Sequence, residues 1–209
     1  MIIMTTIGHG KLARSIVALG VATCLLSALP VARAQEQSGH SLVDAALIAA
    51  ARNAVRRAVL DAKSVVSPAF MSPMSARGVF VTIERDGRVI GCRGTLRPRH
   101  ADLLAETTAA ATSAATSDPR YRPLTPGDLS RFLVTVTVVE RLEPLDRTSA
   151  LVLTPADGIA LESGTRTGVV LPLEGRDPAT RLRWAYKKAG VPDGSPCRLW
   201  RVVARRSRG

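Results

Sequence analysis

Apolar residues recur along this chain with two different periods, which predict helices and strands in alternation. Residues 41–62 carry apolar positions every three to four residues, so the pattern predicts an amphipathic helix that begins at Ser41. A second helix is predicted over residues 101–116. A third follows Asp177 and ends at Gly190, a residue type that favours the left-handed helix end. Its core face is expected to include Leu182, Ala189 and either Trp184 or Ala185.

Strands are indicated where β-branched residues cluster or alternate with polar ones. Residues 78–84 and 88–92 flank an Asp-Gly pair, which is typical of a hairpin turn. Residues 132–139 alternate between valine on one face and leucine or threonine on the other, which predicts a strand. Residues 199–204 are predicted to form the final strand. Short strands are also expected near residues 150–154, 158–162 and 167–172, and a short helix begins at Thr125-Pro126. Hairpins outnumber strand–helix–strand units, so the sequence predicts an α+β fold.

The first 34 residues have the pattern of a secretory signal peptide. Lys11 and Arg14 precede an apolar run over residues 15–29, and Ala32-Arg33-Ala34 supplies the small residues of a cleavage site. Cleavage would leave Gln35 as the first residue of a periplasmic or secreted protein without a transmembrane segment. The predicted organisation is a signal peptide at 1–34, a polar linker at 35–40 and one domain at 41–209.

The charge balance points to acidic partners. The chain has 29 basic and 17 acidic residues and a net charge of +12; three of the basic residues lie in the signal peptide, so the mature chain carries +9. Nucleic acid is not the expected partner, because the chain has an export signal, scattered aromatic residues and no nucleic-acid motif. The densest basic cluster, residues 201–208, is expected to be a solvated and frayed end.

Two cysteines, Cys92 and Cys197, remain after cleavage. In an oxidising compartment they would either pair or stay apart, and the sequence leaves both open. With His40 and His100 they show no metal-ligand spacing, so no metal or other cofactor is predicted.

The most distinctive local motif is Gly91-Cys92-Arg93-Gly94-Thr95, just after the predicted return strand of the hairpin. The two glycines permit a positive φ or a close approach of backbones. The motif therefore predicts either an exposed cysteine on a tight turn, with backbone N–H groups nearby, or a small buried hydrophobic residue at a strand end.

Several motifs in order resemble the AMMECR-type domain family. The family pattern reads F-V-T, then L-R-G-C-I-G-T, then D-P-R-F-x-P-L-T, then L-P and K-A-G-L. The matching segments here are Phe80–Thr82, Gly91–Thr95, Asp118–Thr125, Leu171-Pro172 and Trp184–Gly190. The resemblance covers residues 42–205. It differs around the cysteine, because Ile90 stands where the family has arginine and Arg93 where it has isoleucine.

The resemblance implies a larger and a smaller lobe around a mixed, largely antiparallel sheet. It also implies a likeness to protein A of the AmmeMemoRadiSam system, whose associates are a Memo-like and a radical-SAM protein, an association that is hard to reconcile with export. No activity is firmly established for the family. The residues that the resemblance assigns to the site are Gly91, Cys92, Gly94 and Thr95, with Asp118, Arg120 and Pro123 as a second segment.

Three functions fit these features. The first is a binding or accessory module in which Arg93, Arg120 and Arg122 bind a carboxylate or phosphate, although Asp118 and Arg120 would equally form a structural ion pair. The second is a thiol-dependent enzyme with Cys92 as nucleophile.

In that enzyme Arg93 would lower the pKa of the Cys92 thiol and Thr95 would help to bind an anion, with His100 as the nearest base in sequence. The third function is a periplasmic protein that acts by binding another protein.

Overall fold

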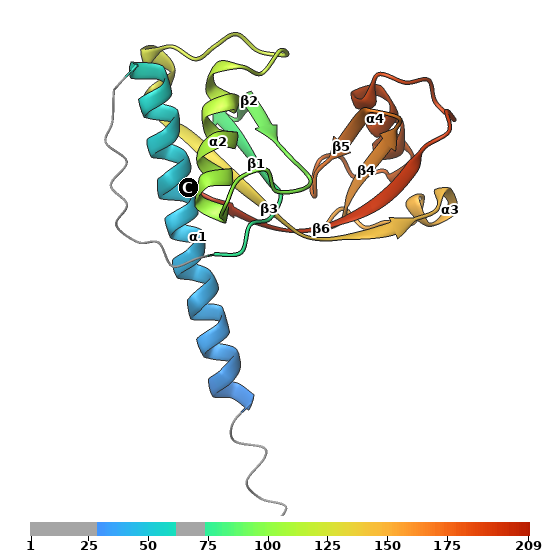
Figure 1. Cartoon of the computed structure of the whole chain (residues 1–209), viewed down its shortest axis with the longest axis horizontal. Coiled ribbons are helices and arrows are strands. Elements are labelled where there is room, and N and C mark those ends of the chain that lie inside the picture. Colours follow the sequence, from blue (N-terminus) through green and yellow to red (C-terminus); the bar gives the residue numbers. More distant parts are fainter. Residues whose placement is uncertain (1–28, 62–73) are drawn as a thin grey trace, which may run out of the picture. The chain divides into compact units, whose positions relative to one another are not determined.

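The computed structural model describes residues 29–61 and 74–209, and side chains from Leu42 onward. Residues 41–209 form one compact unit. The elements, in chain order, are α1 (Leu29–Leu60), β1 (Val79–Arg85), β2 (Arg88–Gly94), α2 (Leu103–Thr116), a 3₁₀ helix η1 (Pro126–Leu129), β3 (Phe132–Leu145), α3 (Arg147–Ala150), β4 (Gly158–Ser163), β5 (Arg166–Val170), α4 (Pro178–Ala189) and β6 (Arg198–Arg208) (Figure 1).

The strands form a single six-stranded sheet in the order β2-β1-β3-β6-β4-β5. Every pairing between these strands is antiparallel, which confirms the predicted α+β class. Strands β3 and β6 are the longest, and their pairing runs from Thr135–Arg208 to Leu145–Leu199. These two strands extend through both parts of the sheet. Helices α1 and α2 cover one part, the larger lobe, and α4 covers the other, the smaller lobe (Figure 1).

Each of these two parts has its own apolar core. In the larger lobe, Leu47 and Val55 of α1 are fully buried against β1 and β3, together with an alanine-rich face of α2. Burying a side chain of this size contributes about 1.5–3 kcal/mol, so both helices are anchored. In the smaller lobe, Ile159 and Leu161 of β4 pack against Ala185 of α4.

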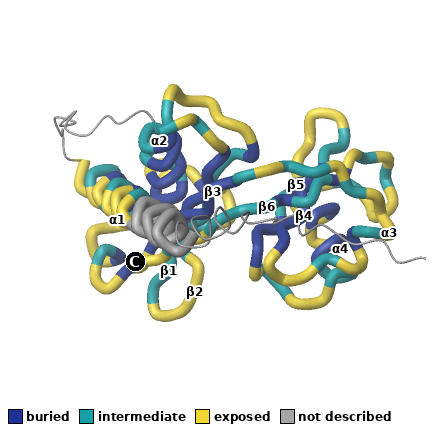
Figure 2. Tube along the Cα trace, turned by 90° about the horizontal axis from the view of Figure 1, so that it is seen from below, coloured by how far each residue is buried: buried dark blue, intermediate teal, exposed yellow. Residues whose placement is uncertain are grey.

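A third apolar cluster joins the two lobes. Phe80 of β1 and Val139 of β3 lie in the same cluster as Ala160, Leu171 and Val202. This cluster connects the two cores, although Figure 2 shows that β6 is mostly half-buried between them. The larger and smaller lobes therefore share a continuous interior.

The first helix begins earlier than the sequence pattern predicts. It starts at Leu29 rather than Ser41, so residues 35–40, expected as a linker, are helical. Residues 32–37 are Ala, Arg, Ala, Gln, Glu and Gln, which are good helix formers, and Pro30 lies in the first turn, where proline is tolerated. Residues 1–28 of the expected signal peptide lie outside the described residues. Among the described residues, no helix has the length and apolar character needed to cross a bilayer.

The predicted ends of α4, Asp177 and Gly190, were confirmed, and α2 begins with a cap of the same kind. The Asp102 carboxylate accepts a hydrogen bond from the Ala105 backbone N–H at the start of α2. The Asp177 carboxylate caps α4 in the same way, and Gly190 ends it with a φ of 68°. On α4, Ala185 is the core residue, whereas Trp184 is 41% exposed.

The predicted strand at 150–154 is absent, because the helix α3 and a turn occupy this region. The Asp146 carboxylate accepts from the backbone N–H of Ser149, and this cap favours a helical turn over an extended chain.

The prediction of a solvated, frayed C-terminus is also wrong. Strand β6 continues to Arg208, and Gly209 forms backbone hydrogen bonds with Val134 in both directions.

Candidate functional site

The cysteine motif lies inside a strand, not on a turn after it. Strand β2 runs from Arg88 to Gly94, and Cys92 pairs with Thr82 of β1. The backbone N–H and C=O of Cys92 point away from β1 and form hydrogen bonds with side chains outside the sheet. Thr82 and Cys92 are therefore a non-hydrogen-bonded pair of the antiparallel ladder. Side chains lie closest in such pairs, and the Thr82 hydroxyl donates to Cys92 Sγ at 3.2 Å.

The two glycines of the motif provide close backbone contact. A Cβ atom at Gly91 would lie 2.2 Å from the carbonyl oxygen of Ala114 on α2. At Gly94 it would lie 2.1 Å from the carbonyl oxygen of Val79 on β1. Neither glycine has a positive φ. The glycines therefore let α2 and β1 approach β2, and they shape the strand that carries Cys92.

Asp118 and Arg120 hold the Cys92 backbone from outside the sheet. Asp118 Oδ2 accepts from the Cys92 N–H at 2.8 Å, and the Arg120 guanidinium donates to the Cys92 carbonyl at 2.7 Å. The two side chains are also bonded to each other, at 2.8 and 3.0 Å. Asp118 is almost fully buried, so the pair supports the structural interpretation of these residues. We call this arrangement the Asp118–Arg120 clamp.

These surroundings shift two pKa values in opposite directions. Burial raises the pKa of the Cys92 thiol, and the hydrogen bond from Thr82 and the charge of Arg120 offset this only in part. Burial also acts to raise the pKa of Asp118, but hydrogen bonds from Arg120 and the Cys92 N–H outweigh it and lower that pKa. The expectation that Arg93 makes Cys92 a thiolate is therefore not met: the thiol is neutral at pH 7.

A cleft of about 910 Å³ opens beside this strand. Of the residues predicted for the site, Cys92, Arg93, Gly94, Thr95 and Arg120 line it. The Thr95 hydroxyl has no hydrogen-bond partner among the described residues. The smaller lobe supplies further lining residues from β5, the following loop and α4, namely Thr167, Val169, Leu171, Glu174, Trp184, Lys187 and Lys188.

The other predicted residues do not reach the cleft. Gly91 is covered by α2, and Asp118 lies behind Arg120. Pro123 is exposed outside the cleft, where its carbonyl accepts a hydrogen bond from Arg122 at 3.0 Å.

Half of the basic side chains that line the cleft are neutralised by carboxylates. Arg97 contacts Glu162 at 2.5 Å, and Lys188 contacts Glu174 at 2.6 Å. Arg120 is bound to Asp118. The other three, Arg93, Arg99 and Lys187, have no carboxylate partner within the described part of the chain, and each is exposed. The cleft therefore presents three positive charges that no described side chain of the protein neutralises.

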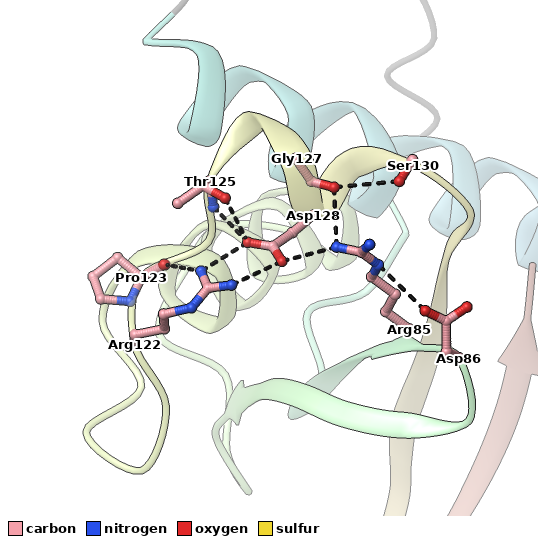
Figure 3. A network of polar contacts seen from close by, with 8 residues as sticks. All are labelled: Arg85, Asp86, Arg122, Pro123, Thr125, Gly127, Asp128 and Ser130. Atoms are coloured by element: carbon pink, nitrogen blue, oxygen red, sulfur yellow. Dashed lines mark hydrogen bonds and ion pairs between the residues drawn. The ribbon is translucent and has the colours of Figure 1, made fainter.

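A second polar network holds Arg122 away from the cleft (Figure 3). The nearly buried Asp128 carboxylate accepts from the Arg122 guanidinium at 2.8 and 2.9 Å and from Arg85 at 3.1 Å. It also accepts from the backbone N–H and hydroxyl of Thr125, so it caps η1. These donors, Arg122 above all, hold the pKa of Asp128 far below its ordinary value. Arg122 is therefore a structural residue.

The remaining candidates for thiol chemistry are not placed around Cys92. His100 is exposed and does not line the cleft; its backbone N–H donates to Glu106. Cys92 and Cys197 are both free thiols, and Cys197 Sγ lies 3.3 Å from the Tyr186 hydroxyl. Within residues 29–61 and 74–209, no group of metal-binding side chains comes together.

Sequence reasoning missed the side of the cleft that α4 provides. Trp184, Lys187 and Lys188 have i, i+3 and i+4 spacing, so they share one face of the helix. This spacing was visible in the sequence, but the face was not expected to meet the cysteine strand. The sequence alone leaves Trp184 as one of two candidates for the core face of this helix, the other being Ala185.

Comparison with known proteins places this arrangement in a family. Residues 48–204 match the AMMECR1 family. A protein of Thermofilum pendens is 38% identical over 170 residues, which cover 71% of this chain and 79% of that protein. A protein of Aeropyrum pernix is 41% identical over 125 residues, so the match spans 54% of each chain, about half the length of that relative.

A solved structure shares the fold. The crystal structure of an uncharacterized protein from Pyrococcus horikoshii superposes with a TM-score of 0.69 at 25% identity, and the match covers 78% of this chain and 89% of that one. The family match over three quarters of the chain and the shared fold agree with each other, and the chain belongs to the AMMECR1 family.

Proposed function

We propose that this protein is an exported binding or accessory module whose cleft takes an anionic small molecule. The observation that carries the proposal is the set of three basic side chains, Arg93, Arg99 and Lys187, that line one cleft and have no carboxylate partner in the described part of the chain. Guanidinium and ammonium groups in a partly enclosed cleft attract anions more strongly than they do on an open surface. A volume of about 910 Å³ also lies within the range of small-molecule sites.

The environment of Cys92 favours a contact role over a nucleophilic one. Its thiol has a raised pKa, and a thiol acts as a nucleophile only after it loses its proton. Among the described side chains, no histidine lines the cleft to remove that proton. We expect Cys92→Ser to fold and to change the affinity for an anionic ligand by less than about fivefold, because a hydroxyl replaces a neutral thiol of similar shape.

Calorimetry with inorganic pyrophosphate tests the proposal. The variant Arg93→Gln/Arg99→Gln/Lys187→Gln removes the three unpaired charges. The control variant Arg77→Gln/Arg88→Gln/Arg206→Gln removes the same charge from exposed positions outside the cleft. We expect the cleft variant to bind at least about tenfold more weakly and the control to change binding less than about twofold, since only the cleft charges act together on one ligand.

Equal losses in both variants would show binding to the general positive surface and would contradict the proposal. Absence of binding to the unaltered protein would contradict it as well.

Export is the second part of the proposal, and it rests on the amino-terminal sequence. Residues 11–34 combine a basic edge, an apolar run and an Ala-Arg-Ala site, as secretory signal peptides do. Cleavage there would shorten α1 to the part that begins at Gln35. The intact mass of the protein from its native compartment tests this: a start at Gln35 is expected, and a mass that includes residues 1–34 would contradict export.

A further inference from the structure

The two tryptophans of the chain differ in whether their rings are already occupied. The Trp200 ring has the Arg97 guanidinium over it, 5.7 Å from the ring centre, and its Nε1 donates to Glu162 at 2.9 Å. Trp184 lines the cleft and is 41% exposed. Among the described residues, no cationic group lies over its ring and its N–H has no hydrogen-bond partner. Trp184 is therefore an aromatic surface that the fold leaves available in the cleft.

The position of the Trp184 ring is nevertheless fixed on one side. A Cβ atom at Gly175 would lie 2.8 Å from Cζ3 of the ring, so the backbone of this loop touches the ring edge. Gly175 has a φ of 76°, a conformation that favours glycine. A ring held at its edge while much of its surface is exposed is suited to stacking with a planar ligand.

The helix that carries Trp184 also places one free cation beside it. Lys187 and Lys188 follow Trp184 by three and four residues, so all three side chains lie on adjacent positions of one helix face. Lys188 is bound to Glu174 and to the Val169 carbonyl. Lys187 has no such partner among the described residues. The aromatic surface and an unneutralised ammonium group are therefore neighbours in the same cleft.

The number of unpaired charges selects among anions. Lys187, Arg93 and Arg99 together carry three positive charges. A phosphate monoester carries about −1.5 to −2 at pH 7, whereas a carboxylate carries −1. A phosphate also has three terminal oxygens for the forked donors of arginine. The charge surplus is therefore better matched by a phosphate group than by a single carboxylate.

We propose that the ligand of the cleft is a phosphate monoester with a planar ring, bound with the ring against Trp184 and the phosphate among Lys187, Arg93 and Arg99. This inference rests on the proposed function, because it names the chemical class of the anion. A nucleoside monophosphate is a ligand of this class, and a cleft of about 910 Å³ has room for one.

Calorimetry with matched probes tests the two halves of the ligand separately. The probes are adenosine monophosphate and phenyl phosphate, which have both halves; adenosine, which has only the ring; inorganic phosphate, which has only the anion; and benzoate, a ring with a carboxylate. We expect at least one ring phosphate to bind at least about tenfold more tightly than inorganic phosphate, and adenosine and benzoate to bind more weakly still.

Variants of Trp184 assign the ring. Trp184→Leu should bring the affinity for the ring phosphate down to that for inorganic phosphate and leave inorganic phosphate unchanged. Trp184→Phe keeps a ring and should stay within about threefold of the unaltered protein. Lys187→Gln should weaken the ring phosphate and inorganic phosphate alike. Because Trp184 is exposed, both of its variants are expected to fold, which circular dichroism checks.

Other results of these experiments would overturn either this inference alone or the proposed function as well. Equal affinities for the ring phosphates and inorganic phosphate, or no effect of Trp184→Leu, would overturn this inference and leave the proposed function intact. Benzoate binding as tightly as phenyl phosphate would overturn it in favour of a carboxylate ligand. No binding of any phosphate, including pyrophosphate, would overturn both.

Discussion

The arginines of β6 and three basic side chains of the cleft, Arg93, Arg99 and Lys187, carry the same charge in opposite surroundings. Arg201 contacts Asp157 at 2.7 Å and Glu143 at 3.2 Å. Arg208 contacts Glu84 across the sheet. Arg205 contacts Asp44 of α1 and Glu140 of β3. Three of the four arginines in the densest basic segment of the sequence are thus neutralised within the fold.

These three basic residues of the cleft are spread along the chain. Arg93 and Arg99 flank the end of β2, and Lys187 lies on α4, almost ninety positions later. None of them has a carboxylate partner among the described residues. This difference shows that a high local density of charged residues in a sequence does not by itself indicate a binding site. What distinguishes the two regions is whether acidic side chains are folded against the basic ones.

We expect the largest loss of stability when an ion pair of β6 is removed. Asp157→Ala removes a nearly buried carboxylate that accepts from Arg201 at 2.7 Å and from the Thr154 hydroxyl at 2.7 Å. We expect the free energy of unfolding to fall by about 3 kcal/mol, because buried hydrogen bonds to charged groups are lost together. Urea unfolding measures the change, and Asp193→Ala, at an exposed position, is the control. Pyrophosphate affinity should stay within about twofold, since Asp157 does not line the cleft.

Asp118 shares features of both regions, because it is a carboxylate that neutralises Arg120, a basic residue of the cleft. Its folded pKa is lowered, so the unfolded chain takes up a proton more readily. The stabilisation by Asp118 is therefore complete above the unfolded pKa of about 4 and is lost as the pH falls below it. We expect Asp118→Asn to lower the free energy of unfolding by about 1–2 kcal/mol at pH 7 and by much less at pH 3.

Urea unfolding at the two pH values measures this difference. An equal loss at pH 7 and pH 3 would mean that the charge of Asp118 contributes nothing. Asp193→Asn serves as the control for the general effect of removing a carboxylate.

A smaller effect is expected at the exposed end of β6. Arg208→Gln breaks the contact with Glu84, which joins two partly exposed side chains. Surface ion pairs contribute about 0–1 kcal/mol, so we expect a loss of about 0.5 kcal/mol that disappears at high salt. Thermal unfolding at low and high salt measures it. A loss that is unchanged by salt would place the stabilisation in packing instead of charge.

The smallest effect on stability is expected at Lys187. Lys187→Gln removes an unpaired charge from an exposed helix position, so the free energy of unfolding should change by less than about 0.5 kcal/mol. The affinity for pyrophosphate should nevertheless fall about fivefold, because this charge acts on the ligand. Unfolding and calorimetry on the same variant measure both. A clear loss of stability without loss of affinity would remove the distinction between the two regions.

Local signals explain how much of this protein could be predicted from sequence. The hairpin at Asp86-Gly87, the helix ends at Asp177 and Gly190 and the α+β class follow from short-range patterns, and all were confirmed. The family motifs pointed to Cys92 and Arg120, which do line the cleft. Each of these features depends on residues that are close in the chain.

The rest depends on tertiary contacts that no local pattern contains. Trp184 and Lys187 belong to the site because the sheet brings α4 to the same cleft as β2. The C-terminal arginines are ordered because their acidic partners come from distant segments, such as Glu84. The backbone of Cys92 is bonded by Asp118 and Arg120, which lie more than twenty positions later in the chain, and the Gly-rich sequence alone does not reveal these contacts.

The Asp118–Arg120 clamp also determines what can happen at the rim of the sheet. Strand β2 is an outermost strand, and unpaired backbone groups there would invite a strand from another molecule. At Cys92 both groups are already bonded to side chains. Intermolecular sheet extension, the first step of aggregation, is therefore blocked at the middle of this strand. Removal of the clamp should therefore leave these two backbone groups of β2 open to pairing with a strand of another molecule.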